Sequence, residues 1–239
     1  MAPITARLSD LAADVLFTSV QINAVTELAP KYLKVTLGCE AFARAKWTPG
    51  DKLQLRPRRG SLAMRTYTPI NWNTDEGSTD VIAYRHGDGP AVDWFNNAEA
   101  GAGAEIFGPS RSLDLGDTVA RTIFVGDETS IGLAYALNHL DTEATYLYEA
   151  TDPDALSAVL TALENIENTE VFAKAEDRGQ LLEAIVQAAE GCSSSSLDLI
   201  VTGDAATVNA VRRSLKRRPD LTPRIKARAY WAHGRTGLS

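Results

Sequence analysis

The sequence has little cysteine and no long apolar run. Cys39 and Cys192 are the only cysteines in 239 residues, too few for a disulfide framework and too isolated for a zinc or iron–sulfur site. No apolar run approaches the roughly 20 residues that cross a bilayer, and the N-terminus lacks the apolar core of a signal peptide. We therefore expect a cytoplasmic protein without a membrane span.

Positive charge is scarce over most of the chain. The formal net charge of −7 and the pI near 5.1 argue against general nucleic-acid binding, which needs a basic surface. From Arg212 to the end, however, nine Lys or Arg residues stand against one acid, a balance of +8, while the remainder carries −15. This asymmetry predicts an anionic ligand near the C-terminal segment.

The sequence pattern of the first half of the chain predicts an antiparallel barrel. After a short helix expected over Leu8 to Phe17, apolar and polar residues alternate with a period of two, as in half-buried strands. Turns around Pro30 and Gly50 separate these stretches. The pattern predicts a six-stranded barrel that ends near Gly116, so residues 1–116 form the first domain. The expected strands lie at Val20–Ala24, Leu33–Leu37, Leu53–Leu55, around Arg65, at Val81–Arg85 and at Ala104–Phe107.

In the second half, residues 117–239, the pattern of apolar residues predicts a parallel sheet covered by helices. Short continuous apolar runs replace the alternation, and helical patterns lie between them. The expected strands are Thr122–Val125, Ala144–Tyr148, Val171–Ala173 and Leu197–Val201, and the expected helices are Ser130–Leu140, Asp154–Leu163, Gly179–Ala189 and Ala205–Leu215.

The stretch Met64 to Pro69 combines a cation, an aromatic ring and a hydroxyl on one extended segment. Arg65 and Tyr67 share a face, with Thr66 between them and Thr68 close by. Such a set suits a flavin: Arg65 for a phosphate, Tyr67 for the ring plane and Thr68 for the ring edge. Taken alone, the segment also fits ordinary β-structure.

A glycine-rich turn follows, where a barrel strand leads into a helix. His86-Gly87-Asp88-Gly89-Pro90-Ala91 lets backbone N–H groups approach a phosphate closely, and the helix start adds its positive end. The same residues fit a simple turn with a helix start.

Two further turns follow apolar strands in the second half. Gly126-Asp127-Glu128-Thr129 and Gly203-Asp204-Ala205 each join a strand to a helix, the position where parallel sheets bind dinucleotides. Neither is a full glycine fingerprint, and two capped helices explain them equally well. Glu149, at the end of the second apolar strand, resembles an acid that binds a ribose 2′-hydroxyl, which favours NADH. Arg178 or the cluster around Arg212 could instead accept a 2′-phosphate, so NADPH stays open.

The chain ends in a basic segment with an aromatic pair. Arg212, Arg213, Lys216, Arg217 and Arg218 fit the solvated end of a helix. Lys226 and Arg228 alternate on an extended stretch that leads to Tyr230, Trp231 and Arg235 and are better candidates for an anionic ligand.

Together these motifs resemble the siderophore-interacting proteins, a family of ferredoxin reductase-like flavoproteins. The resemblance rests on five segments in order: Arg65–Thr68, His86–Ala91 with Trp94, Phe107–Pro109, Gly126–Thr129, and Tyr230–Trp231 with Gly234–Arg235. It implies an FAD-binding barrel followed by a nicotinamide-binding α/β domain, with NADH or NADPH as electron source and a ferric siderophore as substrate. We expect a monomer.

The resemblance also implies roles for single residues. The residues expected to bind FAD are Arg65, Thr66, Tyr67, Thr68, His86, Gly87, Gly89, Pro90 and Ala91. Those expected to bind the nicotinamide cofactor are Gly126, Asp127, Glu128, Thr129, Gly203, Asp204 and Ala205, and Tyr230 and Trp231 are also expected to contact the cofactors. The residues expected to bind the siderophore are Arg111, Lys226, Arg228 and Arg235. No protein acid, base or metal ligand is required. Two alternatives remain open: a flavin reductase with another acceptor, and a non-catalytic protein that binds FAD or a siderophore.

Overall fold

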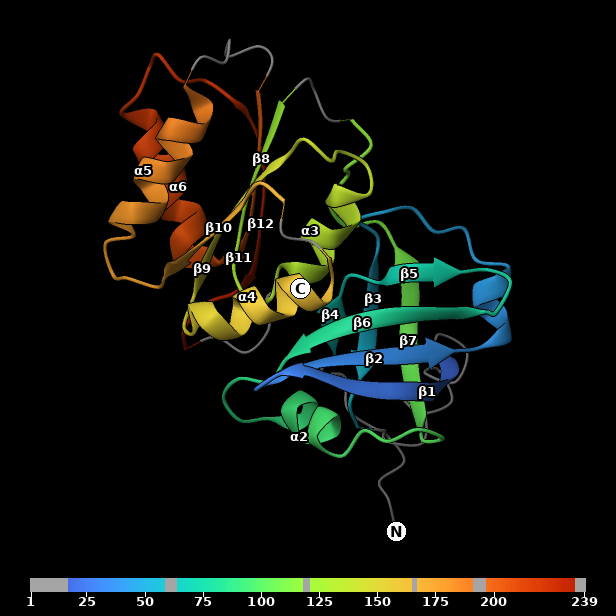
Figure 1. Ribbon diagram of the computed structural model, residues 1–239. Coiled ribbons are helices and arrows are strands. Elements are labelled where there is room, and N and C mark those ends of the chain that lie inside the picture. Colours follow the sequence, from blue (N-terminus) through green and yellow to red (C-terminus); the bar gives the residue numbers. More distant parts are fainter. Residues whose placement is uncertain (1–16, 59–63, 118–120, 165–166, 191–196, 235–239) are drawn as a thin grey trace, which may run out of the picture. The chain divides into compact units, whose positions relative to one another are not determined.

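The computed structural model describes residues 17–58, 64–117, 121–164, 167–190 and 197–234. The chain divides between Ser112 and Leu113 into two compact units, close to the limit expected near Gly116. The helix expected over Leu8 to Phe17 falls almost entirely outside the described residues. Figure 1 labels the elements of both units, which are described separately below.

The N-terminal unit contains a seven-stranded antiparallel sheet. Six strands coincide with the predicted ones, but the predicted number was wrong, because the short strand β5 was missed. β5 spans only four residues, and its pairing with β6 is irregular, so it shows no clear alternation. The order is β4-β3-β7-β1-β2-β6-β5. The strands are β1 (Thr18–Ala29), β2 (Tyr32–Gly38), β3 (Lys52–Arg56), β4 (Arg65–Tyr67), β5 (Ile70–Asn73), β6 (Ser78–Tyr84) and β7 (Gly103–Ser110), with the 3-10 helix η1 (Glu40–Ala43) and the helix α2 (Pro90–Asn96).

The alternation seen in the sequence determines the core of this sheet. Val20 and Ile22 on β1 and Val35 and Leu37 on β2 point inward, because alternate residues of a strand share a face. Phe95 of α2 packs into the same cluster.

The two edge strands of the sheet are joined directly by the chain. β4 and β5 lie at opposite ends of the strand order, yet only Thr68 and Pro69 separate them in sequence. Since consecutive Cα atoms are about 3.8 Å apart, the two edges approach within about 11 Å of each other. β4 also contacts β6, which confirms that the sheet curls into a barrel. The predicted flavin segment therefore lies at the barrel seam, where β4 has one unpaired edge.

The C-terminal unit contains a five-stranded parallel sheet in the order β10-β9-β8-β11-β12. The four predicted strands and four predicted helices are confirmed, and the basic segment adds a fifth strand, β12. The elements are β8 (Arg121–Gly126), α3 (Ile131–Asn138), β9 (Thr145–Ala150), α4 (Pro153–Ala162), β10 (Thr169–Ala173), α5 (Gly179–Ala189), β11 (Leu197–Asp204), α6 (Ala205–Lys216) and β12 (Arg224–Trp231).

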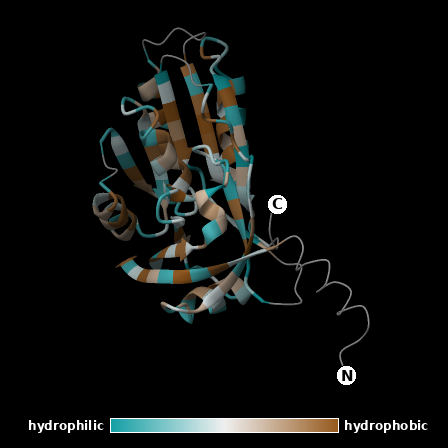
Figure 2. Ribbon diagram, turned by 90° about the vertical axis from the view of Figure 1, so that its right-hand side faces the viewer, coloured by the Kyte–Doolittle hydropathy of each residue, from teal (hydrophilic) through white to brown (hydrophobic). Residues whose placement is uncertain are grey.

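Helices cover both faces of the parallel sheet, as continuous apolar strands require. α5 and α6 pack on one face, where Leu181 and Val211 meet Val125 and Leu199. α3 and α4 cover the other face, which carries the rings of Phe124 and the tyrosines of β9. Figure 2 shows apolar segments running along the central strands.

The strand order fixes where a ligand would enter this unit. From β8 the chain first adds β9 and β10 on one side, then adds β11 and β12 on the other. The order therefore reverses between β8 and β11, and ligands of open parallel sheets bind at such a reversal, beyond the carboxyl ends of the strands. The two predicted turns, after β8 and after β11, meet at this point. No helix within the described ranges is both long and apolar enough to span a membrane.

Candidate functional site

Arg65 lies at the barrel seam, and none of the described acids forms an ion pair with it. Its guanidinium donates a hydrogen bond to the carbonyl oxygen of Met64 at 3.0 Å. By contrast, Arg56 and Arg85 pair with Glu105 and Glu27. An arginine without a carboxylate partner suits an anionic ligand, because nothing has to be displaced when the ligand binds.

Tyr67 brings the seam and the glycine-rich turn together. Its ring lies edge-to-face against Phe95 of α2, with 5.3 Å between the ring centroids. Burial raises the pKa of the Tyr67 hydroxyl, and the charge of Arg65 opposes this shift. The ring is therefore neutral and half-buried, as a residue that packs against a planar cofactor should be. Thr66 is exposed beside it, and Thr68 is half-buried in the connection to β5.

The turn before α2 leaves open space for a ligand. Gly87 and Gly89 have φ angles of +63° and +142°, which residues with a side chain rarely adopt, and a Cβ added at either would meet nothing within 4 Å. No side chain caps the first turn of α2, which begins at Pro90. His86 is exposed and stacks on Tyr84 at 5.3 Å. These features fit the phosphate groups of FAD.

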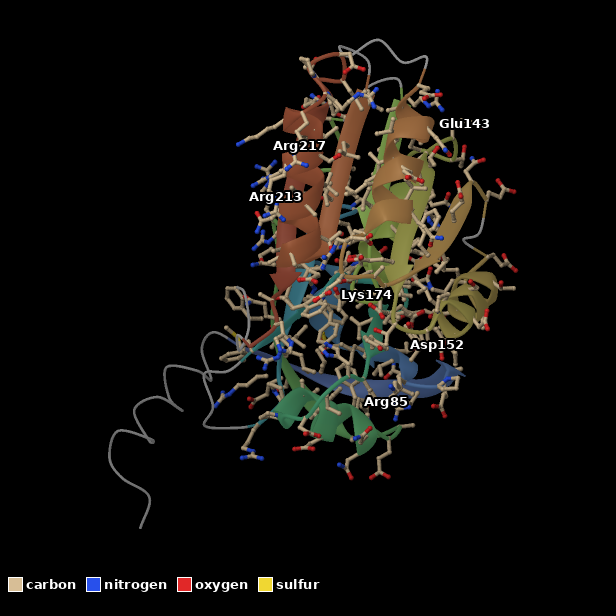
Figure 3. The ribbon with its side chains drawn as sticks, turned by 90° about the vertical axis from the view of Figure 1, so that its left-hand side faces the viewer. Arg85, Glu143, Asp152, Lys174, Arg213 and Arg217 are labelled. Carbon is tan, nitrogen blue, oxygen red and sulfur yellow. The ribbon has the colours of Figure 1, made fainter. Side chains whose placement is uncertain are left out.

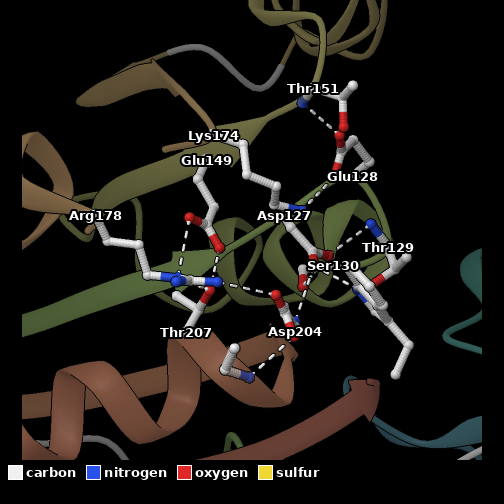
Figure 4. Close-up of polar contacts among 12 residues, drawn as sticks. Asp127, Glu128, Thr129, Ser130, Glu149, Thr151, Lys174, Arg178, Asp204 and Thr207 are labelled. Atoms are coloured by element: carbon white, nitrogen blue, oxygen red, sulfur yellow. Dashed lines mark hydrogen bonds and ion pairs between the residues drawn. The ribbon is translucent and has the colours of Figure 1, made fainter. Parts of the chain in front are cut away.

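In the C-terminal unit, the carboxylate of Asp127 occupies the point where the strand order reverses. Its Oδ1 accepts hydrogen bonds from the backbone N–H and the hydroxyl of Thr129, at 2.9 and 2.6 Å. Its Oδ2 accepts from the backbone N–H of Asp204 at 2.9 Å and from the indole N–H of Trp231 at 2.7 Å. Asp127 is only 1% exposed, and burial raises its pKa, although the hydrogen bonds from Thr129 and Trp231 and the charge of Lys174 oppose the shift. The side chain thus joins the ends of β8, β11 and β12 (Figure 4).

Glu128 connects the end of β8 to the segment that follows β9. Its Oε1 accepts a hydrogen bond from the backbone N–H of Thr151 at 2.6 Å, and its Oε2 lies 3.6 Å from the ammonium of Lys174. That ammonium also lies over the ring of Trp231, 4.7 Å from its centroid. Lys174 therefore neutralises one acid and fixes one aromatic ring.

Glu149 points inward and does not face a ribose. It is 1% exposed, it accepts a hydrogen bond from the hydroxyl of Thr207, and Nε of Arg178 lies 3.6 Å from its Oε2. Burial raises its pKa, opposed by Thr207 and by the charges of Lys174 and Arg178. Asp204 shares Arg178, at 3.1 Å. The sequence-based interpretation of Glu149 as a ribose ligand is wrong, because this carboxylate is already engaged inside the unit.

We call Asp127, Glu128, Glu149, Asp204, Lys174 and Arg178 the strand-end cluster. Its carboxylates occupy backbone N–H groups that a pyrophosphate would use: those of Thr129 and Asp204 bind Asp127, and that of Ala206 binds Asp204. Gly203 offers no cradle either, since a Cβ there would lie 2.4 Å from the Asp127 carboxyl carbon. A dinucleotide would therefore lie outside these turns.

The predicted siderophore cations differ in their availability. The ammonium of Lys226 binds the backbone carbonyls of Asp114 and Asp117, at 3.1 and 2.9 Å. Arg228 is half-buried on β12, Arg111 is exposed in the N-terminal unit, and Arg235 lies outside the described residues. On α6, Arg213 and Arg217 project away from the sheet, as the solvated-end interpretation predicts (Figure 3).

Sequence reasoning named Arg178 only as a candidate for a phosphate and did not single out Lys174, so it missed the ion pairs of both residues in the strand-end cluster. Both follow β10, just as the Gly126 and Gly203 turns follow β8 and β11. That shared position after a strand was the available signal. The described residues contain no group of three or more His, Cys, Asp or Glu side chains that could hold a metal ion.

Comparison with known families agrees with both units. The model of the siderophore-interacting FAD-binding domain matches residues 48–113, and that of the siderophore-interacting proteins matches residues 119–234. The chain belongs to the siderophore-interacting protein family. This is a family of FAD-binding oxidoreductases, and the first match assigns FAD to the barrel, where Arg65, Tyr67 and the glycine-rich turn fit it. No curated protein sequence matches the chain significantly.

Solved structures of two siderophore proteins and of a ferredoxin reductase share the fold. Siderophore-interacting protein SipS from Aeromonas hydrophila is 18% identical, with a TM-score of 0.74 and 92% of each chain covered. A siderophore utilization protein from T. fusca is 20% identical, with a TM-score of 0.70, covering 94% of this chain and 96% of that one. The ferredoxin reductase in carbazole 1,9a-dioxygenase is 19% identical, with a TM-score of 0.68, covering 90% of this chain and 68% of that one. The chain therefore has the ferredoxin reductase-like fold.

Proposed function

We propose that the protein is an FAD-dependent reductase that passes electrons from NADH or NADPH to a ferric siderophore and releases Fe(II) in the cytoplasm. The observation that carries this proposal is the barrel seam. There Arg65, which forms no ion pair with a described acid, and a neutral Tyr67 lie beside the open turn at Gly87 and Gly89. The family match supports flavin chemistry.

Arg65 would bind a phosphate of FAD and Tyr67 would pack against the ring, while Thr68 would hydrogen-bond the ring edge. His86, Gly87, Gly89 and Ala91 would receive the remaining phosphate oxygens. Because Tyr67 packs on Phe95, its orientation is fixed before the cofactor arrives, which lowers the entropic cost of binding. The thiol, imidazole and carboxyl groups of the chain have no step of proton transfer to perform in this scheme.

The bound flavin supplies the conversion of a hydride donor into single-electron transfers, which iron requires. One NAD(P)H gives up a hydride, two ferric ions are each reduced by one electron, and one proton is released. Hard oxygen donors hold Fe(III) more tightly than Fe(II), so reduction weakens the siderophore complex and frees the metal. Arg111 and Arg228 remain our candidates for attracting an anionic siderophore.

The first experiment is a spectrum of the purified protein, followed by anaerobic addition of NADH or NADPH and then of a ferric siderophore with a ferrous-ion trap. The flavin bands should bleach with nucleotide and recover as trapped Fe(II) appears. Arg65→Ala should lose FAD on gel filtration, whereas Arg44→Ala, an exposed arginine of the same unit paired with Glu40, should keep it. Equal FAD content in the two variants would refute the role of Arg65.

A non-catalytic FAD- or siderophore-binding protein is the second candidate. It is favoured by the strand-end cluster, whose carboxylates occupy the backbone N–H groups of Thr129, Asp204 and Ala206. This candidate predicts bound flavin that neither nucleotide reduces. A flavin reductase with another acceptor predicts bleaching by nucleotide without Fe(II) production.

A further inference from the structure

The cations beside β9 are already bound to the protein's own carboxylates. In open parallel sheets that bind dinucleotides, the end of the second strand is where the ribose 2′ position is recognised, by an acid for a hydroxyl or an arginine for a phosphate. Here the second strand is β9, and β10 is its only neighbour besides β8. Lys174 and Arg178 follow β10, so they are the cations placed to meet a 2′-phosphate.

Each of the three guanidinium nitrogens of Arg178 already donates a hydrogen bond within the unit. Nε donates to the Thr207 hydroxyl at 2.8 Å, Nη1 donates to the Glu176 carbonyl oxygen at 2.9 Å, and Nη2 donates to Asp204 at 3.1 Å. Its side chain is 13% exposed, and Glu149 lies beside it. If Arg178 turned toward a phosphate, it would leave two buried carboxylates without their cation, which is strongly unfavourable.

Lys174 is also committed. It is the only described cation that pairs with Glu128, which is buried, and its side chain is 22% exposed. Its position over Trp231 adds a cation–π contact that a phosphate would have to replace. Figure 3 places Lys174 at the opposite end of the parallel sheet from Glu143.

The remaining described cations of the unit are too distant from the end of β9. Arg228 lies on β12, three strand spacings or about 14 Å away across the sheet. Arg212 lies eight residues beyond Asp204 on α6, about 12 Å further along the helix. The strand-end cluster itself has four acids and two cations. The 2′-phosphate of NADPH would therefore enter a site that already has excess negative charge.

From this arrangement we infer that the C-terminal unit selects NADH over NADPH. The inference rests on the proposed function. NADH and NADPH carry the same pyrophosphate, so any cost of placing it outside the occupied turns cancels in the comparison, and only the 2′-phosphate, with about two negative charges, distinguishes them. The selectivity arises from the ion pairs that hold Lys174 and Arg178, and no direct ribose contact from Glu149 is needed.

Two measurements on the FAD-loaded protein test the selection. Calorimetric titrations with NAD+ and NADP+ report binding alone, and anaerobic flavin reduction reports kcat/KM for NADH and NADPH. We expect NAD(H) to be favoured by at least about tenfold, or 1.4 kcal/mol, in both. Equal values or a preference for NADP(H) would overturn the inference and leave the proposed function intact. Flavin that neither nucleotide reduces would overturn both.

A pair of matched variants tests the cause. Glu149→Gln removes one buried charge beside Arg178 with little change of shape. It should lower the ratio of kcat/KM for NADH to kcat/KM for NADPH several-fold. Glu143→Gln removes the same charge from an exposed residue just before the amino end of β9 and should leave the ratio unchanged. Because each ratio is measured on one protein sample, partial loss of folded protein cancels. Equal narrowing by both variants would refute the local explanation.

Discussion

Replacing Asp127 by asparagine should destabilise the C-terminal unit strongly. The carboxylate receives hydrogen bonds from Thr129 on one oxygen and from Asp204 and Trp231 on the other. Asparagine keeps one oxygen and turns a donor toward the other pair, so two buried donors lose their acceptor. Each such loss costs about 1–3 kcal/mol.

Part of that loss should be recovered, because burial makes the Asp127 charge itself unfavourable, as its raised pKa indicates. We therefore expect a net loss of about 3 kcal/mol in the free energy of unfolding. For a unit of this size, the transition midpoint should fall by about 10 °C.

Thermal unfolding followed by tryptophan fluorescence is the assay, because Trp231 is the only tryptophan of the C-terminal unit. Its indole N–H loses its acceptor in Asp127→Asn, so its emission should also shift before unfolding. Asp154→Asn, an exposed position in the first turn of α4, is the matched control and should change stability by no more than about 0.5 kcal/mol. An Asp127→Asn midpoint within 2 °C of the control would refute this account of the strand ends.

Three further predictions follow from the glycines and from Glu149. Gly203→Ala should cost at least about 2 kcal/mol of stability by denaturant titration, since its φ is +100° and its Cβ would collide with Asp127. Gly87→Ala should cost only about 1 kcal/mol, because its Cβ meets nothing, yet should weaken FAD binding at least about tenfold in a fluorescence titration; unchanged affinity would remove this turn from the FAD site. Because the folded-state pKa of Glu149 is raised, the free energy of unfolding of the wild type, relative to that of Glu149→Gln, should fall as pH rises from about 4 through that pKa. A relative free energy of unfolding that instead rises with pH would contradict the burial of this charge.

The sequence by itself determined the two-unit plan. Alternating residues such as Val20, Ile22, Val35 and Leu37 can bury only one face, which makes an antiparallel barrel, and the continuous apolar run Thr122–Val125 requires cover on both faces. These patterns are local, so a single sequence contains them in full. The segment that we propose for the flavin could be predicted for the same reason, because its cation, ring and hydroxyl lie within four consecutive residues, Arg65 to Thr68.

Only the tertiary structure decided which way the polar side chains point. Asp127 accepts from Asp204, 77 positions away in the chain, and Glu149 accepts from Thr207, 58 positions away. From the sequence, an acid after a strand fits a ribose ligand as well as an internal clasp, because both need a carboxylate at the same place. The strand order, which places β11 beside β8, decides between them by bringing backbone N–H donors to the Asp127 carboxylate. β5 was missed for a similar reason, since four residues become a strand only when β6 supplies their partners.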